Sequence, residues 1–518
     1  MSSSETDAAS EPSNPSDFEP RSIAVLSAVV IAIAAIPILI HPLPPLSDYI
    51  NHLGRTYIIS NIASDPNFAR FYYVEWQVLP NLMIDLVLTV LNFFMSVYVA
   101  GQIFTIAAFI LIVSGALALN RALFGSWSAL PLIVAPLLYN GVLLVGVMNY
   151  VFGIGIALWA LAVWVMMRER MWLWRLSIAS LFAVAMFFCH LYVVGIYGLV
   201  LLAFELRRLW ERRAEPLLPR LADFFACGIP FLIVLGLLLM SPTWDAAGDY
   251  YWMAAGKIDG LFLAVDVYYP PVAFALMACV FAAAGWAYWR GILHFHPLGW
   301  FLLPVGAIVY IAMPRELFAA YLADQRLPIA LAYVLIACFR VDFENSLIRN
   351  ATVGLILVLL IGRVVEIEYV WSQLGAVSEA FYRSVMLINR GARVLVVYGE
   401  RSASAAISDL ELVHAASLAT IERSALVSTT FTVRGKQVLH VRNEFKRYVE
   451  TEDRLPPAIP YFVQAAHSDV PYFFARWPQH FDYVYILFTK HEINPAPKDL
   501  NLLFDGPSFQ LYRVIRPK

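Results

Sequence analysis

Long uninterrupted hydrophobic stretches constrain the fold of this chain more than any other feature. Of its 518 residues, 60% are hydrophobic and only 14% are charged. A soluble protein of this length has too little interior to bury that much apolar surface. Many stretches also exceed the roughly 18 residues that cross a hydrocarbon core about 30 Å thick. The sequence therefore predicts an all-α polytopic membrane protein.

The N-terminal residues and the cysteines are best explained without a catalytic or metal-binding role. Residues 1–20 are rich in Ser, Glu and Pro and predict a disordered tail. The stretch Ile23–Ile40 follows no basic segment and ends without a small-residue cleavage site, so we expect a retained helix. We interpret the cysteines as apolar packing residues, because they lack the spacing of a metal site: Cys189, Cys227, Cys279 and Cys338. A net charge of -2 gives no reason to expect nucleic acid as a partner.

Clusters of arginine orient the chain. The segments 168–175 and 207–220 are rich in Arg, and such loops remain in the cytoplasm. This predicts a cytoplasmic N-terminus and an extracytoplasmic C-terminus. The stretch 79–94 carries Pro80 and Asp85, so we expect a surface or re-entrant helix there. About eleven spans are expected, at residues 22–41, 97–119, 128–146, 150–167, 174–189, 191–206, 222–241, 271–289, 297–313, 327–341 and 350–369.

The character of the sequence changes near residue 370. We expect a transmembrane domain at 21–370 and a small extracytoplasmic α/β domain at 371–518. Residues 370–390 predict an amphipathic helix. Short β-rich stretches predict strands at Arg393–Gly399, Val438–Val441, Tyr483–Phe488 and Gln510–Val514. This domain has no Gly-rich phosphate-binding motif.

The strongest candidate site follows the first hydrophobic stretch. An acid, an amide, an imidazole and a guanidinium lie within eight residues, at Asp48, Asn51, His52 and Arg55. On a helix, spacings of three and four put Asp48, His52 and Arg55 on one face. This set supplies a base and an anion binder at the bilayer surface. The alternative is structural: Asp48 caps the helix and pairs with Arg55.

Other polar residues are expected on the same outer side. His190 falls between two short helices, and Asn149 begins the helix 150–167, whose N-terminus offers N–H groups to an anion. A buried polar role for His190 and a capping role for Asn149 remain alternatives.

Two further outer segments, 242–270 and 314–326, carry candidate ligand binders. The planar guanidinium group of Arg can bind two phosphate oxygens at once. The ring of a Tyr in a loop can stack on a sugar. The candidates are Tyr250, Lys257, Arg315 and Arg326. Instead of binding a ligand, the aromatic residues of 242–270 can belong to an aromatic belt at the membrane interface. The two arginines can instead extend toward water at the membrane surface or pair with Glu316 and Asp324.

This layout resembles the GT-C superfamily of membrane glycosyltransferases. The likeness covers about residues 20–370. Asp48 matches an acid in the first large outer loop of these enzymes, and residues 79–94 match a juxtamembrane helix in that loop. The segment Asn120–Gly125 resembles the short cytoplasmic turn after the second span. The resemblance implies transfer of a sugar from a polyprenyl-phosphate donor to a lipid, glycan or protein acceptor, in a bacterial inner (plasma) membrane with the C-terminal domain in the periplasm. Members often carry two adjacent acids in the loop, whereas Asp48 is followed by Tyr49.

The chemistry of such a transfer assigns roles to the candidates. Asp48 is the expected general base, with His52 beside it, in an inverting transfer. Substrate-binding residues are expected at Asn51, Arg55, Asn149, His190, Tyr250, Lys257, Arg315 and Arg326. The absence of a DxD motif favours a lipid-linked donor, and the sequence indicates neither a cofactor nor a divalent metal. The alternatives are a transporter or flippase, and a non-catalytic partner in envelope glycan or lipid export.

Overall fold

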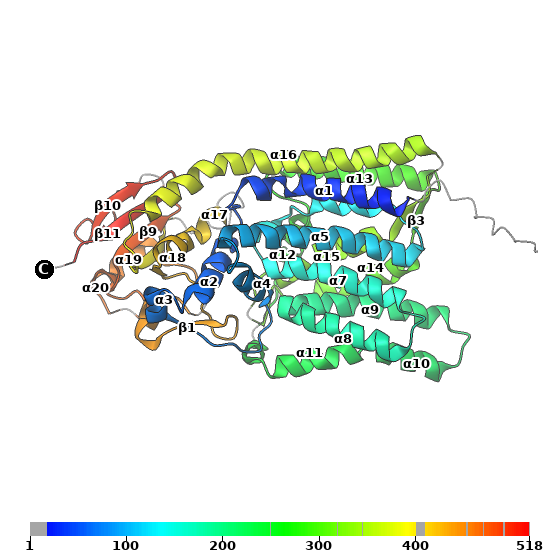
Figure 1. Cartoon of the computed structure of the whole chain (residues 1–518), viewed down its shortest axis with the longest axis horizontal. Helices are drawn as coiled ribbons and strands as arrows, with labels where there is room; N and C mark the ends of the chain where they lie inside the picture. The colour runs from blue at the N-terminus through cyan, green and yellow to red at the C-terminus, as the bar shows by residue number, and fades with distance from the viewer. Residues whose placement is uncertain are drawn as a thin grey trace, which may run out of the picture.

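The chain forms a helical bundle with a sheet-containing domain at one end (Figure 1). The computed structural model describes residues 18–248, 250–318, 320–343, 345–399, 410–451, 454–469, 471–489 and 493–516. Most of the tail expected at 1–20 lies outside these residues.

Long apolar helices make up the bundle, which confirms the expected helical membrane architecture. Among the described residues, six helical stretches are long and apolar enough to cross a membrane: Pro20–Ile40 (α1), Val97–Phe124 (α5), Met148–Met166 (α7), Trp172–Cys189 (α8), Leu217–Leu239 and Pro270–Trp289 (α13). Two shorter apolar stretches are Leu130–Val145 and Pro297–Ala312 (α14). The helices Leu191–Glu211 (α9), Ala323–Ala337 (α15) and Ser346–Val385 (α16) complete the bundle.

The span expected at 128–146 is not one continuous helix. A 3₁₀ helix, Leu130–Leu137 (η1), is followed by a short helix, Gly141–Val145 (α6). Pro136 has no N–H to continue an α-helix, and the Asn140 side chain accepts the N–H of Leu143 to begin α6. The prediction of an unbroken span is therefore wrong here.

Two other expected spans differ in their bounds. The span at 222–241 consists of Leu217–Ala226 (α10) and Ile229–Leu239 (α11), which are separated just before Pro230. Helix α15 begins at Ala323 rather than at 327, so Arg326 lies in a helix and not in a loop.

Helix α16 joins the two parts of the molecule. Its 40 residues continue through residue 370, and at 1.5 Å per residue they extend for about 60 Å. The end of α16 packs on the sheet, where the Phe381 ring stacks on Tyr485 at 4.7 Å and Ser384 Oγ lies 2.7 Å from the Tyr485 hydroxyl. The chain thus leaves the bundle on a continuous helix (Figure 1).

A five-stranded mixed sheet forms the centre of the C-terminal domain. Its strand order is β10-β11-β9-β6-β7. Strand β6 (Arg393–Tyr398) runs parallel to β7 and β9, and β11 is antiparallel to β9 and β10. The other bounds are Leu426–Val427 (β7), Tyr483–Leu487 (β9), Leu500–Asp505 (β10) and Phe509–Val514 (β11). Three of the expected strands therefore lie in one sheet.

The first outer segment connects the bundle to this domain. It contains Tyr49–Asn61 (α2), Pro66–Phe71 (α3), Tyr72–Val74 (β1) and Met83–Leu91 (α4). Strand β1 pairs with Leu439–Val441 (β8), the fourth expected strand, and α2 packs against Leu418–Arg423 (α18). With nine residues, α4 is too short to cross a membrane.

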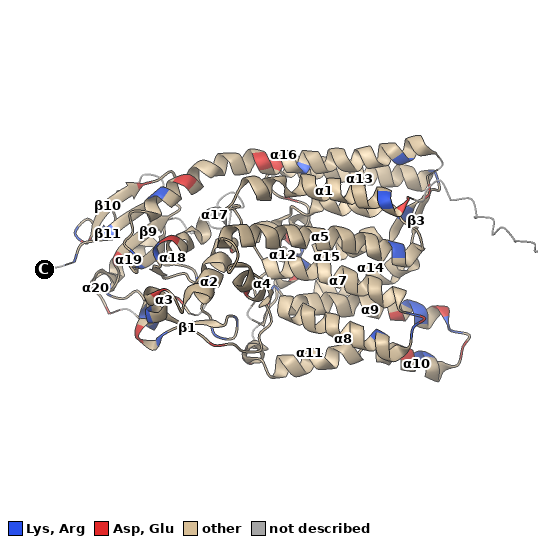
Figure 2. Cartoon of the chain, viewed as in Figure 1, with Lys and Arg blue, Asp and Glu red and all other residues tan. Residues whose placement is uncertain are grey.

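The arginine clusters lie at the end of the bundle opposite the sheet. Figure 2 shows Lys and Arg gathered near α10 and the neighbouring end of α9. Under the positive-inside rule, this arrangement predicts that the sheet domain is extracytoplasmic.

Labelling of single cysteines tests this orientation. Arg213 in an arginine cluster and Lys498 in the C-terminal domain both have exposed side chains. In a cysteine-free background, a membrane-impermeant maleimide added to spheroplasts should label the Lys498→Cys protein directly. The Arg213→Cys protein should react only after permeabilisation. The reverse pattern would invert the predicted topology.

Candidate functional site

A cavity of about 240 Å³ lies where the bundle meets the C-terminal domain. Four residues singled out in the sequence line this cavity: Asp48, His52, His190 and Arg326. His414, from the C-terminal domain, lines it as well. Segments far apart in the chain therefore bring a carboxylate, a guanidinium and three imidazoles to one site.

Asp48 precedes α2 and directs its side chain to the cavity rather than to the helix. Its N–H donates to the Val145 carbonyl at 3.0 Å. Gly146, with φ of +84°, lies so close that a Cβ there would be 2.7 Å from the Asp48 nitrogen. The Asp48 carboxylate makes no capping hydrogen bond with α2, and Arg55 pairs with another acid. The structural alternative for Asp48 is therefore contradicted.

His414 lies beside Asp48, with Nε2 3.4 Å from a carboxylate oxygen. The amide of Asn51 determines which nitrogen of His414 carries the proton. Its Oδ1 accepts the N–H of Phe431 at 3.1 Å, and its Nδ2 donates to the Thr429 carbonyl at 2.7 Å. Because these backbone groups fix the amide, Nδ2 also donates to His414 Nδ1 at 3.2 Å. Neutral His414 thus carries its proton on Nε2, facing Asp48.

A buried ion pair holds the other side of α2. Arg55 donates to both carboxylate oxygens of Asp85, at 2.8 and 2.9 Å. Both side chains are almost fully buried. The same guanidinium donates to His52 Nδ1 at 3.1 Å. Burial lowers the pKa of His52 well below its usual range, with Arg55 and His414 contributing. A neutral His52 whose Nδ1 accepts from Arg55 must carry its proton on Nε2, which makes it a donor rather than a base.

Arg326 contributes a positive charge to the wall of the cavity. It donates to His190 Nε2 at 2.9 Å and to the Tyr321 carbonyl at 2.8 Å. Its guanidinium lies 5.9 Å from the Tyr150 ring and 5.7 Å from the Tyr192 ring. Among the described residues, no carboxylate lies within ion-pair distance of Arg326. Its charge is therefore available to an anion in the cavity.

Six other residues expected at the site do not line the cavity: Asn51, Arg55, Asn149, Tyr250, Lys257 and Arg315. Asn51 orients His414, and Arg55 holds His52, as described above. The side-chain oxygen of Asn149 accepts the N–H of Ile84 at 2.7 Å. Asn149 therefore satisfies a backbone N–H in the first turn of α4.

The remaining three residues belong to the neighbouring outer segments. Buried Asp324 pairs with Lys257 at 3.0 Å and with Arg315 at 3.2 Å, so the pairing alternative for Arg315 is confirmed. Tyr250 is 73% exposed and lies in the two-residue strand β2, Tyr250–Tyr251, which pairs with β4, Glu316–Leu317.

Comparison with solved structures finds the same architecture in ArnT from Cupriavidus metallidurans. The crystal structure bound to undecaprenyl phosphate is 10% identical, covers 96% of this chain and 98% of that chain, and has a TM-score of 0.52. The apo structure is also 10% identical, with 95% and 97% covered and a TM-score of 0.54. This chain has a GT-C fold. No protein family and no curated protein matches the sequence.

The GT-C fold extends over the C-terminal domain as well as the bundle, since nearly the whole chain is aligned. The likeness expected from residues 20–370 is therefore confirmed and extended. Within this fold, the cavity lies between the first outer segment and the C-terminal domain.

The Arg55–Asp85 pair should dominate the local stability of the site. The Asp85→Asn variant leaves a buried guanidinium without its counter-charge, and breaking such pairs costs about 3–5 kcal/mol. The double variant Arg55→Met/Asp85→Leu removes both charges and should be more stable than Asp85→Asn alone. Thermal unfolding of detergent-purified protein measures both. A double variant no more stable than the single one would show that the ion pair is not the determining contact.

Proposed function

We propose that this protein transfers a glycosyl group from a polyprenyl-phosphate donor to an acceptor hydroxyl in the cavity. The observation that carries the proposal is the placement of the Asp48 carboxylate and the Arg326 guanidinium around one cavity. A base for the acceptor and a cation for the leaving phosphate are the two groups that such a transfer requires.

A neighbouring apolar groove supports a lipid-linked donor. The groove has a volume of about 380 Å³ and runs along α9, α11, α14 and α15. It shares Leu191, Tyr192 and Phe318 with the cavity. An isoprenoid chain in this groove would bring its phosphate toward Arg326. ArnT has been crystallised with undecaprenyl phosphate, which is a ligand of this shape.

The proposed step is a single displacement. The acceptor oxygen attacks the anomeric carbon as the bond from that carbon to the phosphate oxygen breaks, and polyprenyl phosphate leaves. Asp48 accepts the proton of the acceptor hydroxyl. Arg326 stabilises the charge on the leaving phosphate, and the Nε2–H of His52 adds a donor. Direct attack inverts the configuration of the anomeric carbon.

We place this reaction on the extracytoplasmic side of a bacterial inner membrane. The arginine clusters at the opposite end of the bundle support this side (Figure 2). The acceptor would therefore be a lipid, glycan or protein that is exposed there.

The first test concerns the proposed base. The Asp48→Asn variant keeps the shape of the side chain but cannot accept a proton. Transfer from a polyprenyl-phosphate sugar donor should fall by at least the ~10²-fold typical of a general base. The matched control is Asp259→Asn, because Asp259 is an exposed acid that does not line the cavity. Wild-type turnover by a folded Asp48→Asn protein would remove Asp48 from the mechanism.

The second test concerns His414 as a positioning residue for Asp48. The His414→Gln variant retains an N–H donor near the position of Nε2, whereas His414→Ala removes it. We expect the Gln variant to keep most of the turnover and the Ala variant to lose about tenfold, the value of one hydrogen bond to a charged group. Combined with Asp48→Asn, His414→Ala should cost little more. Equal losses for Gln and Ala, or additive losses in the double variant, would contradict this role.

A further inference from the structure

Two more cavities lie in the C-terminal domain, and we call them the middle and the outer cavity. The middle cavity, of about 350 Å³, is lined by Tyr73, Glu75, Arg434 and His440 among others. The outer cavity, of about 400 Å³, is lined by Glu450, Arg454, Tyr461 and Tyr472 among others. The two cavities share Lys446 and Thr451, so they are neighbouring parts of one surface.

The segment 431–437 connects this surface to the catalytic cavity. Phe431, Lys436 and Gln437 line the catalytic cavity, whereas Thr432 and Arg434 line the middle cavity. One short stretch of chain thus forms a wall of both cavities. The middle cavity and the catalytic cavity therefore border the same segment.

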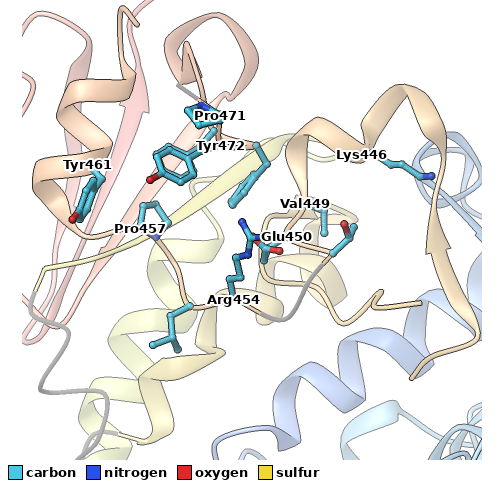
Figure 3. A pocket seen from close by; sticks show the side chains of 12 residues that line it. Lys446, Val449, Glu450, Arg454, Pro457, Tyr461, Pro471 and Tyr472 are labelled. Atoms are coloured by element: carbon cyan, nitrogen blue, oxygen red, sulfur yellow. The ribbon is translucent and has the colours of Figure 1, made fainter. Parts of the chain in front are cut away.

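The outer cavity presents aromatic rings that are held in place. Tyr472 stacks on buried Phe474 with parallel planes, 5.2 Å between ring centres. Tyr472 nevertheless remains 43% exposed, and Tyr461 is 53% exposed. Figure 3 shows the side chains of Arg454 and Glu450 pointing toward one another beside Tyr472. Tyr rings with an open face can stack on sugar rings.

The middle cavity has the same chemistry. Tyr73 lies against the His440 ring at 5.3 Å and is 38% exposed. Glu75 and Arg434 line the same cavity. The Nε2 of His440 is buried and has no hydrogen-bond partner among the described residues. This nitrogen is therefore a hydrogen-bonding group that the described residues do not use.

These rings do not form a membrane-facing aromatic belt. Tyr461 belongs to Ile459–Ala465 (α19). Figure 1 shows α19 beside the sheet, in the C-terminal domain at the end of the molecule away from α10. Tyr rings that anchor membrane proteins lie at the bilayer interface, whereas α19 belongs to the C-terminal domain and not to the apolar helices of the bundle.

We infer that the middle and outer cavities bind a saccharide chain that is the acceptor of the proposed transfer. This inference rests on the proposed function and selects a glycan from the acceptor classes. The sugar rings stack on Tyr73, Tyr461 and Tyr472, and one end of the chain reaches the catalytic cavity past the segment 431–437.

Binding of defined oligosaccharides tests the inference without turnover. The probes are cellotetraose, mannotetraose, chitotetraose and galactotetraose, added to the full-length protein in nanodiscs and followed by saturation-transfer NMR. We expect at least one probe to bind, about tenfold more weakly to Tyr472→Ala, a loss of about 1.4 kcal/mol, because the variant lacks the ring on which a sugar stacks. Tyr472→Phe keeps the ring and should bind as the wild type does. The matched control is Tyr288→Ala, because Tyr288 is an exposed ring on α13.

The outcomes separate this inference from the proposed function. If no probe binds, or if Tyr472→Ala and Tyr288→Ala bind like the wild type, the saccharide site is overturned while transfer dependent on Asp48 stands. Oligosaccharide binding by a protein whose turnover does not depend on Asp48 would overturn the proposed mechanism instead. In a turnover assay, Tyr472→Ala should raise the KM for the saccharide acceptor about tenfold, with kcat and donor binding unchanged. A change in kcat alone would contradict a binding role.

Discussion

The amide of Asn51 is the contact on which the site depends. Its three hydrogen bonds reach Thr429, Phe431 and His414, all in the C-terminal domain, while its backbone belongs to α2. Since the side chain is fully buried, loss of any of these bonds would leave a polar group unsatisfied. The same residue thus joins the two parts of the protein and directs the proton of His414 toward Asp48.

Among the described arginines around the site, charge pairing leaves Arg326 without a carboxylate partner. Arg55 is neutralised by Asp85, and Lys257 and Arg315 share Asp324. Arg326 instead has a neutral imidazole and two tyrosine rings as neighbours. A guanidinium between aromatic rings is partly desolvated, which strengthens its attraction for an anion in the cavity. This distribution explains why one arginine among several faces the cavity.

The sequence predicted the membrane architecture well because hydrophobic length alone requires helices in a bilayer. The strands were predictable for a similar reason, since β6 and β9 are short apolar stretches between turns. Breaks at Pro136 and before Pro230 were missed, because total hydrophobicity outweighs a single proline in such stretches.

The site was predicted only in part. Local spacing placed Asp48 and His52 together, and the charge-derived topology brought His190 and Arg326 to the same side. No spacing rule relates His414 to Asn51, which lies 363 residues away. The sequence also could not show that Arg55 forms its ion pair with Asp85 rather than with Asp48, because this pairing depends on how α4 packs against α2.

The length of helix α16 means that a small tilt of this helix moves its far end by several ångströms. A rod of about 60 Å that tilts by about 5° moves its far end by about 5 Å, and that far end is packed on the sheet. A transmembrane helix that is longer than the local hydrocarbon thickness accommodates the mismatch by tilting. Because the sheet packs on the end of α16, the position of the sheet relative to the bundle depends on the tilt of this helix.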